Sequence, residues 1–122
     1  PERPSVQVSA EDTFEHDLPL DELAPHIRRL AEKAWAGHRR EVGRVARTVV
    51  LKLKTAQFQT LTRSLTPATR PASAAELAEI ACALRARVEL PPDTRYRLVG
   101  VGLSGFIDAD DEAIQPDLFA RH

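Results

Sequence analysis

Residues 47–66 carry the pattern that most constrains the fold. Their sequence, RTVVLKLKTAQFQTLTRSLT, alternates apolar and polar side chains with the two-residue period of a β-strand. A short break at residues 55–57 divides the run, so it predicts two antiparallel strands joined as a hairpin. The apolar side chains of the first strand that would face the core are Val49, Leu51 and Leu53. The other face of the hairpin is polar, and it would lie away from the core.

Charge is strongly polarised along the chain. The segment from Val42 to Ala75 contains six Lys or Arg and no Asp or Glu, although the whole chain has a formal net charge of -1. Acidic residues are concentrated instead in residues 1–25 and 106–122. A basic sheet face that is also rich in Thr and Ser suits a polyanion, and DNA is the first candidate. Charge blocks that only keep the surface solvated are the alternative interpretation.

Two elements are expected before the hairpin. A strand is predicted at Ser5–Ser9, extending toward Phe14, and an amphipathic helix follows from Leu20 to His38. Pro25 requires either an irregular first turn or a regular helix that begins near Ala24, because its ring would clash inside a helix.

The second half of the chain completes a β-α-β-β-α-β order. The second hairpin strand is expected at residues 58–66, and Ser73 with Glu76 forms a capping box that starts another helix. Pro91 ends that helix, and a last strand is expected from Tyr96 to Phe106. This order predicts an α+β fold, in which two helices cover one face of a four-stranded antiparallel sheet.

Length and composition predict one soluble domain without catalytic chemistry. Residues 1–106 would form the domain and residues 107–122 a flexible acidic tail. The absence of Met suggests a piece of a longer protein, and the sequence shows neither a signal peptide nor a membrane-spanning run. A cytoplasmic monomer is expected. The four His lack zinc-ligand spacing, Cys82 stands alone, and no glycine-rich phosphate loop occurs, so no catalytic residue, metal or cofactor is predicted.

The exposed face of the hairpin holds the residues that would bind a polyanion. The polar side chains that share this face in regular strands are Lys52, Lys54, Thr62 and Ser64. Arg63 points to the other side in a regular strand, and a buried Arg is unfavourable, so a bulge or a strand end is expected there. In the last strand, Gly100 and Gly102 leave one face without side chains, which would allow the close approach of another backbone.

Four stretches together resemble the C-terminal little finger domain of Y-family translesion DNA polymerases of the bacterial DNA polymerase IV type. They are Ser5–Phe14, Arg47–Lys54, Phe58–Ser64 and Arg97–Gly105. The resemblance covers nearly the whole chain and implies the same β-α-β-β-α-β fold. It also implies that the sheet lies in the major groove of a primer–template duplex and contacts its backbone. The residues that would contact DNA are Arg47, Thr48, Lys52, Lys54, Thr62, Arg63 and Ser64.

The end of the chain resembles a second feature of this family. Residues 115–119, Gln-Pro-Asp-Leu-Phe, look like the pentapeptide that docks such polymerases on the sliding clamp, the β subunit. The resemblance implies that Gln115 fills a small polar pocket, and that Leu118 and Phe119 fill an apolar one. Pro116 stands where the family usually has an aliphatic residue. A tail that packs on its own domain is the alternative.

The resemblance implies a parent enzyme that adds nucleotides past DNA lesions with Mg²⁺, with its catalytic residues outside these 122 residues. A catalytically inactive Y-family accessory protein would carry the same domain. A generic α+β module that binds RNA or protein is the third hypothesis. An RNA binder of this kind should expose aromatic side chains on the sheet, and Tyr96 is the only tyrosine of the chain.

Overall fold

The computed structural model of the chain describes residues 7–40 and 43–108. In these residues the elements follow the predicted β-α-β-β-α-β order, with two short 3₁₀ turns. The elements are β1 (Val8–Pro19), η1 (Leu20–Glu22), α1 (Ala24–His38), β2 (Arg44–Thr55), β3 (Thr60–Leu65), α2 (Ala74–Ala83), η2 (Leu84–Arg87) and β4 (Arg95–Asp108). None of the helices in this part of the chain is long and apolar enough to cross a membrane.

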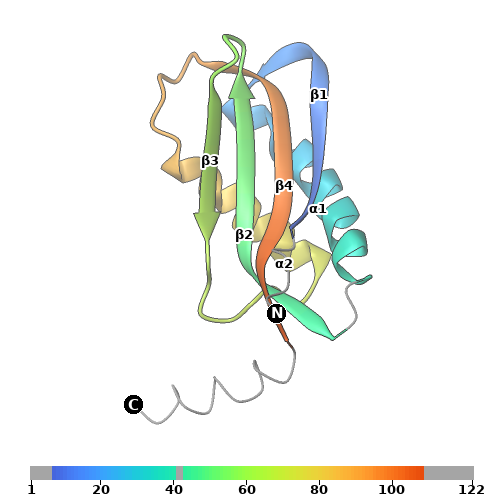
Figure 1. Cartoon of the computed structure of the whole chain (residues 1–122). Coiled ribbons are helices and arrows are strands. Elements are labelled where there is room, and N and C mark those ends of the chain that lie inside the picture. Colours follow the sequence, from blue (N-terminus) through green and yellow to red (C-terminus); the bar gives the residue numbers. More distant parts are fainter. Residues whose placement is uncertain (1–6, 41–42, 109–122) are drawn as a thin grey trace.

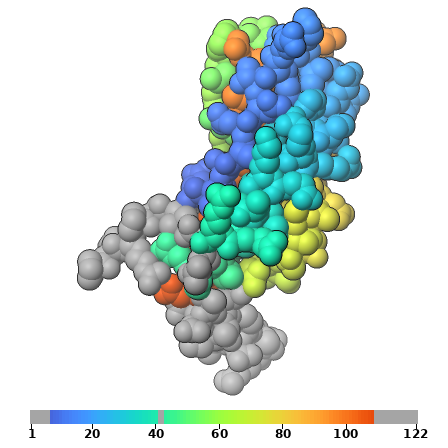
Figure 2. Space-filling view, turned by 90° about the vertical axis from the view of Figure 1, so that its right-hand side faces the viewer, coloured from blue at the N-terminus to red at the C-terminus, as the bar shows by residue number. Residues whose placement is uncertain are grey.

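The four strands form one antiparallel sheet in the order β1-β4-β2-β3. Both helices lie on the same face of the sheet, and none of the described helices covers the opposite face (Figure 1). Seen from its side, the molecule has α1 packed along the outer strand β1 (Figure 2). The predicted α+β fold is therefore confirmed for the described residues.

The core lies between the sheet and the two helices. Helical spacing in α1 brings apolar side chains to the face that contacts the strands. Alternation in β2 and β4 places valine and leucine side chains on the side of the sheet that faces the helices, as predicted for the hairpin. The buried side chains of this core include Ile27, Leu30, Ala34, Val49, Leu51, Leu53, Leu77, Val99, Val101 and Leu103.

Local sequence signals set both helix starts as predicted. The regular helix α1 begins at Ala24, so Pro25 lies in its first turn, where a missing N–H is tolerated. At the start of α2, the Ser73 hydroxyl accepts a hydrogen bond from the Glu76 N–H at 3.2 Å. The Glu76 carboxylate accepts from the Ala72 N–H at 2.9 Å, one residue before the expected partner.

The strand ends differ from the expected ones. β1 continues to Pro19, beyond the expected limit at Phe14, because its pairing with β4 extends past an irregularity between Thr13 and Leu18. β3 begins at Thr60, so Phe58 belongs to the turn. β4 ends at Asp108 and therefore includes two residues that the sequence placed in the tail.

Candidate nucleic-acid interface

The face of the sheet that the helices leave uncovered, called the open face below, is organised in three rows across the strands. Because paired residues in neighbouring strands point to the same side, the register of the sheet defines each row. The rows are Ser9, Gly102, Val50 and Ser64; Glu11, Gly100, Lys52 and Thr62; and Thr13, Leu98, Lys54 and Thr60. Hydroxyl groups and two ammonium groups thus dominate this surface.

The two lysines and the hydroxyls of β3 lie together, as the alternation predicted. Lys52 pairs with Thr62 and is half-buried, while Thr62 is exposed. Ser64, also exposed, is two residues further along β3 on the same side. The predicted location of Lys52, Lys54, Thr62 and Ser64 on one face is confirmed, and their contact with a phosphate stays a prediction.

Arg63 lies on the other side of β3. It pairs with the buried Leu51 in a continuous register, so of the two expectations for this position the bulge is wrong, and Arg63 lies two residues before the end of β3 at Leu65. The guanidinium instead reaches along the helix-facing side of the sheet edge. Its Nε donates to the Arg87 carbonyl at 3.0 Å and its Nη1 to the Thr62 carbonyl at 2.9 Å. A contact between Arg63 and a phosphate stays a prediction, and it would require these hydrogen bonds to break.

Thr48 extends the open face beyond the first row. It pairs with Ser104, and its hydroxyl is 2.7 Å from the hydroxyl of Thr66. The neighbouring strand has Gly105 with a φ of 65°, and a Cβ at this position would lie 2.8 Å from the Thr48 Oγ1. Arg47 is half-buried, and its contact with DNA stays a prediction.

An acidic side chain on β1 also reaches the open face. Glu11 and Lys52 both pair with Gly100, from opposite sides of β4. The Glu11 Oε2 and the Lys52 Nζ are 3.3 Å apart, so the two side chains form an ion pair above the glycine. The acidic and basic residues are separated along the sequence, and strand order brings these two together.

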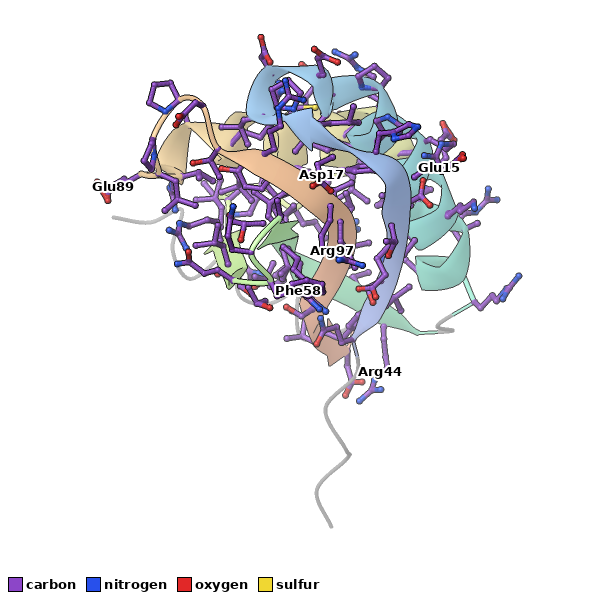
Figure 3. The ribbon with its side chains drawn as sticks, turned by 90° about the horizontal axis from the view of Figure 1, so that it is seen from above. Glu15, Asp17, Arg44, Phe58, Glu89 and Arg97 are labelled. Carbon is purple, nitrogen blue, oxygen red and sulfur yellow. The ribbon has the colours of Figure 1, made fainter. Side chains whose placement is uncertain are left out.

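An aromatic–guanidinium pair at one end of the open face was also missed by the sequence analysis. Phe58 lies in the turn between β2 and β3 with a φ of 70°, and 62% of its surface is exposed. The Arg97 guanidinium carbon lies 4.1 Å from the centre of the Phe58 ring, within cation–π range (Figure 3). Arg97 is an extra residue in β4, because Lys54 pairs with Leu98 and the next residue of β2 pairs with Tyr96. No local pattern in the sequence indicates this bulge.

The surface does not have the aromatic array that stacks single-stranded RNA. Tyr96 is 1% exposed, and its burial raises the pKa of its phenol. In the part of the chain that the structure describes, Phe58 is the only large hydrophobic residue that is exposed. The open face therefore favours contacts with a phosphate backbone over base stacking.

Other charged groups lie outside this face. Asp12 and Arg29 form an ion pair of 2.6 Å between β1 and α1, and the guanidinium lowers the pKa of the Asp12 carboxyl. Among residues 7–40 and 43–108, no group of three or more His, Cys, Asp or Glu is arranged to hold a metal ion. The motif predicted at Gln115, Leu118 and Phe119 lies outside the described residues.

Comparisons with known proteins agree with this geometry. Residues 5–118 match the family described as the impB/mucB/samB family C-terminal domain. A DNA polymerase IV of Xanthomonas euvesicatoria pv. vesicatoria (strain 85-10) is 60% identical over 121 residues, which are 99% of this chain and 33% of that protein. The chain thus spans about a third of the length of the curated relatives that it matches first.

Two solved structures share the fold. A chimaeric Y-family DNA polymerase has a TM-score of 0.70 at 12% identity, over 88% of this chain and 30% of that one. The little finger domain of PolIV, solved in a complex with the beta-clamp processivity factor, has a TM-score of 0.60 at 24% identity. That match covers 80% of this chain and 86% of the solved one.

Proposed function

Because this chain belongs to the impB/mucB/samB C-terminal domains and is the little finger domain of a Y-family DNA polymerase of the DNA polymerase IV type, we propose that its open face grips the backbone of duplex DNA. The observation that carries the proposal is the second and third rows of the open face. There, Lys52 and Lys54 on β2 stand beside the exposed hydroxyls of β3. Ammonium and hydroxyl groups donate to phosphate oxygens, and such contacts position a duplex without reading its bases.

The chemistry of the face explains what this grip would do for a polymerase. Phosphate contacts release counterions from DNA, so the binding depends on salt and tolerates any sequence. A sequence-independent grip is what a polymerase needs as it moves along a template. The domain would therefore raise the residence time of the parent enzyme on its primer–template duplex.

We assign no step of nucleotide addition to this domain. The parent would be a DNA polymerase of the DNA polymerase IV type, and its reaction would take place in other domains with Mg²⁺. The residues that the structure describes offer no carboxylate cluster for that ion. An inactive accessory protein would have the same domain, and the palm carboxylates of the full-length protein distinguish the two. In a bacterium, an enzyme that acts on the chromosome would work in the cytoplasm.

Duplex binding at several salt concentrations tests the proposed face. The test variant is Lys52→Gln with Lys54→Gln, which removes two positive charges from the open face. The matched control is Arg28→Gln with Lys33→Gln, which removes two charges from the exposed surface of α1. Log K falls as log salt rises, and each lost phosphate contact makes this slope less steep by about 0.9. The slope should therefore be about 1.8 less steep for the test variant and should change much less for the control. Equal effects of the two variants would refute the assignment of the face.

We also propose that residues 115–119 tether the chain to a sliding clamp. The proposal is supported by the sequence of this pentapeptide and by the solved little finger of PolIV with a beta-clamp. In calorimetric titrations with a clamp, Leu118→Ala with Phe119→Ala should abolish the heat of binding, because the apolar anchors are removed. Ile114→Ala removes an apolar side chain outside the motif and should leave most of the affinity. Unchanged affinity in the double variant would contradict the tether.

A further inference from the structure

The middle row of the open face joins an acidic strand to a basic one. Glu11 on β1 and Lys52 on β2 do not pair with each other directly, because β4 lies between them. Both face Gly100 of β4, and the Glu11 Oε2 lies 3.3 Å from the Lys52 Nζ. The carboxylate therefore stands beside the ammonium group that is central to the proposed DNA grip.

Gly100 makes this contact possible. A Cβ at position 100 would lie 3.2 Å from the Glu11 Cβ and 3.6 Å from its Oε2. A larger side chain would fill the space above β4 through which the two charged side chains meet. Because Gly100 has no side chain, there is space above β4 on the open face, and the Glu11–Lys52 ion pair occupies this space.

The ion pair is loose enough to be broken by a ligand. The side chains of Lys52 and Glu11 are 42% and 50% exposed, and 3.3 Å is a long separation for a charge-assisted hydrogen bond. Exposed pairs of this kind contribute little, because water solvates both partners. A phosphate, which also carries a negative charge, can take the place of the carboxylate on Lys52.

Glu11 is also the one carboxylate among the paired positions of the open face in the described residues. Its neighbours in the three rows are hydroxyls, glycines, apolar side chains and lysines. A polar surface needs only to be solvated by water. This requirement does not explain why its one paired carboxylate lies opposite Gly100 and beside Lys52.

We propose that Glu11 is a built-in competitor of the DNA phosphate for Lys52, and that it sets the affinity of the open face. The inference rests on the proposed DNA-binding function and adds an opposing residue to it. In the free chain the carboxylate neutralises Lys52. In the complex a backbone phosphate replaces it, and the displaced carboxylate weakens the grip by repulsion. A weakened grip would let the domain release and rebind as the polymerase advances.

A double-mutant cycle on duplex binding tests this competition. The variants are Glu11→Gln, Lys52→Gln and both together. Glutamine has the shape of glutamate without its charge, and it replaces lysine with a shorter, neutral polar side chain. Removing the carboxylate should tighten binding of the chain to a duplex about two- to five-fold at low salt. With Gln at position 52, the same change should tighten binding clearly less, because the cation for which the carboxylate and the phosphate compete is absent and only their mutual repulsion remains. Glu15→Gln is the matched control, since Glu15 is an exposed carboxylate on the same strand but lies where β1 is not paired with β4, between Thr13 and Leu18.

Each outcome has a defined meaning. Unchanged or weaker binding by Glu11→Gln would overturn the competition, and weaker binding would make Glu11 a residue that positions Lys52. An equal gain in the Lys52→Gln background, or an equal gain from Glu15→Gln, would also overturn it, because either shows a general effect of net charge. If the unmodified chain binds no duplex, the proposed function fails and the inference fails with it. Thermal unfolding of each variant confirms that the comparison is between folded chains.

Discussion

Gly105 gives the sharpest prediction about how the end of the open face is built. Its φ of 65° lies in the left-handed region, which costs an alanine about 1–2 kcal/mol. A Cβ there would also lie 2.8 Å from the Thr48 Oγ1, which must move away. That hydroxyl bonds to Thr66 at 2.7 Å, and losing the bond costs about 1 kcal/mol more. Gly105→Ala should therefore lower the free energy of unfolding by about 2–3 kcal/mol.

Gly43 provides a matched control for the backbone part of this cost. It has a φ of 75°, and nothing lies within 4 Å of a Cβ built on it. Gly43→Ala should therefore cost only the conformational part, about 1–2 kcal/mol. In a Thr48→Ala background, Gly105→Ala should also cost only that part, because the crowded hydroxyl and its hydrogen bond are gone.

Urea denaturation followed by circular dichroism measures these differences. For a small protein m in urea is about 1–3 kcal/mol/M, so Gly105→Ala should lower the midpoint by about 0.7–3 M at unchanged m. The midpoint for Gly43→Ala should fall by clearly less. The contact argument would be refuted if the two alanine variants lost the same stability. It would also be refuted if Gly105→Ala cost as much without the Thr48 hydroxyl as with it.

Two predictions concern pH. Burial raises the pKa of Tyr96 above 10.0, so the neutral phenol stabilises the fold fully below pH 10.0 and this contribution is lost as pH rises through the raised pKa. The chain has one tyrosine, so the phenolate absorbance reports on Tyr96 alone. This absorbance should titrate above pH 10.0 in the folded chain and near pH 10.0 in denaturant. A titration midpoint of 10.0 in the folded chain would contradict the burial of the phenol. Arg29 lowers the pKa of Asp12 below 3.8, so Asp12→Asn should reduce stability at neutral pH, and the difference should vanish as pH falls through the lowered pKa. Denaturant titrations of both chains across this range check it, and a difference that does not depend on pH would speak against the ion pair.

Much of the fold was predictable because its signals are local. Alternation over residues 47–66 indicated which side of β2 is buried, and the capping box at Ser73 indicated the start of α2. Both patterns act between residues a few positions apart, so the sequence displays them directly. The resemblance to the Y-family little finger domain, stated from four stretches of sequence, is confirmed by the family match and by the relatives.

The candidate site was predictable only in part. The common side of Lys52, Lys54, Thr62 and Ser64 follows from alternation alone. The side of β3 on which Arg63 lies follows from alternation as well. The hydrogen bonds of Arg63 and the position of Phe58 do not, because they depend on which backbone carbonyls lie nearby and on where the strand begins. Arg63 bonds to a carbonyl of η2, and Phe58 takes a left-handed turn conformation beside Arg97.

The sequence by itself determined that a basic, hydroxyl-rich face lies opposite a helix-covered core. Only the tertiary structure decided what else shares that face. Glu11 and Lys52 are 41 residues apart, and they meet because β4 inserts between their strands with a glycine at the crossing point. A period of two residues fixes the side on which a side chain lies. Its neighbours across the sheet depend on strand order and register, which are set by the packing of the whole domain.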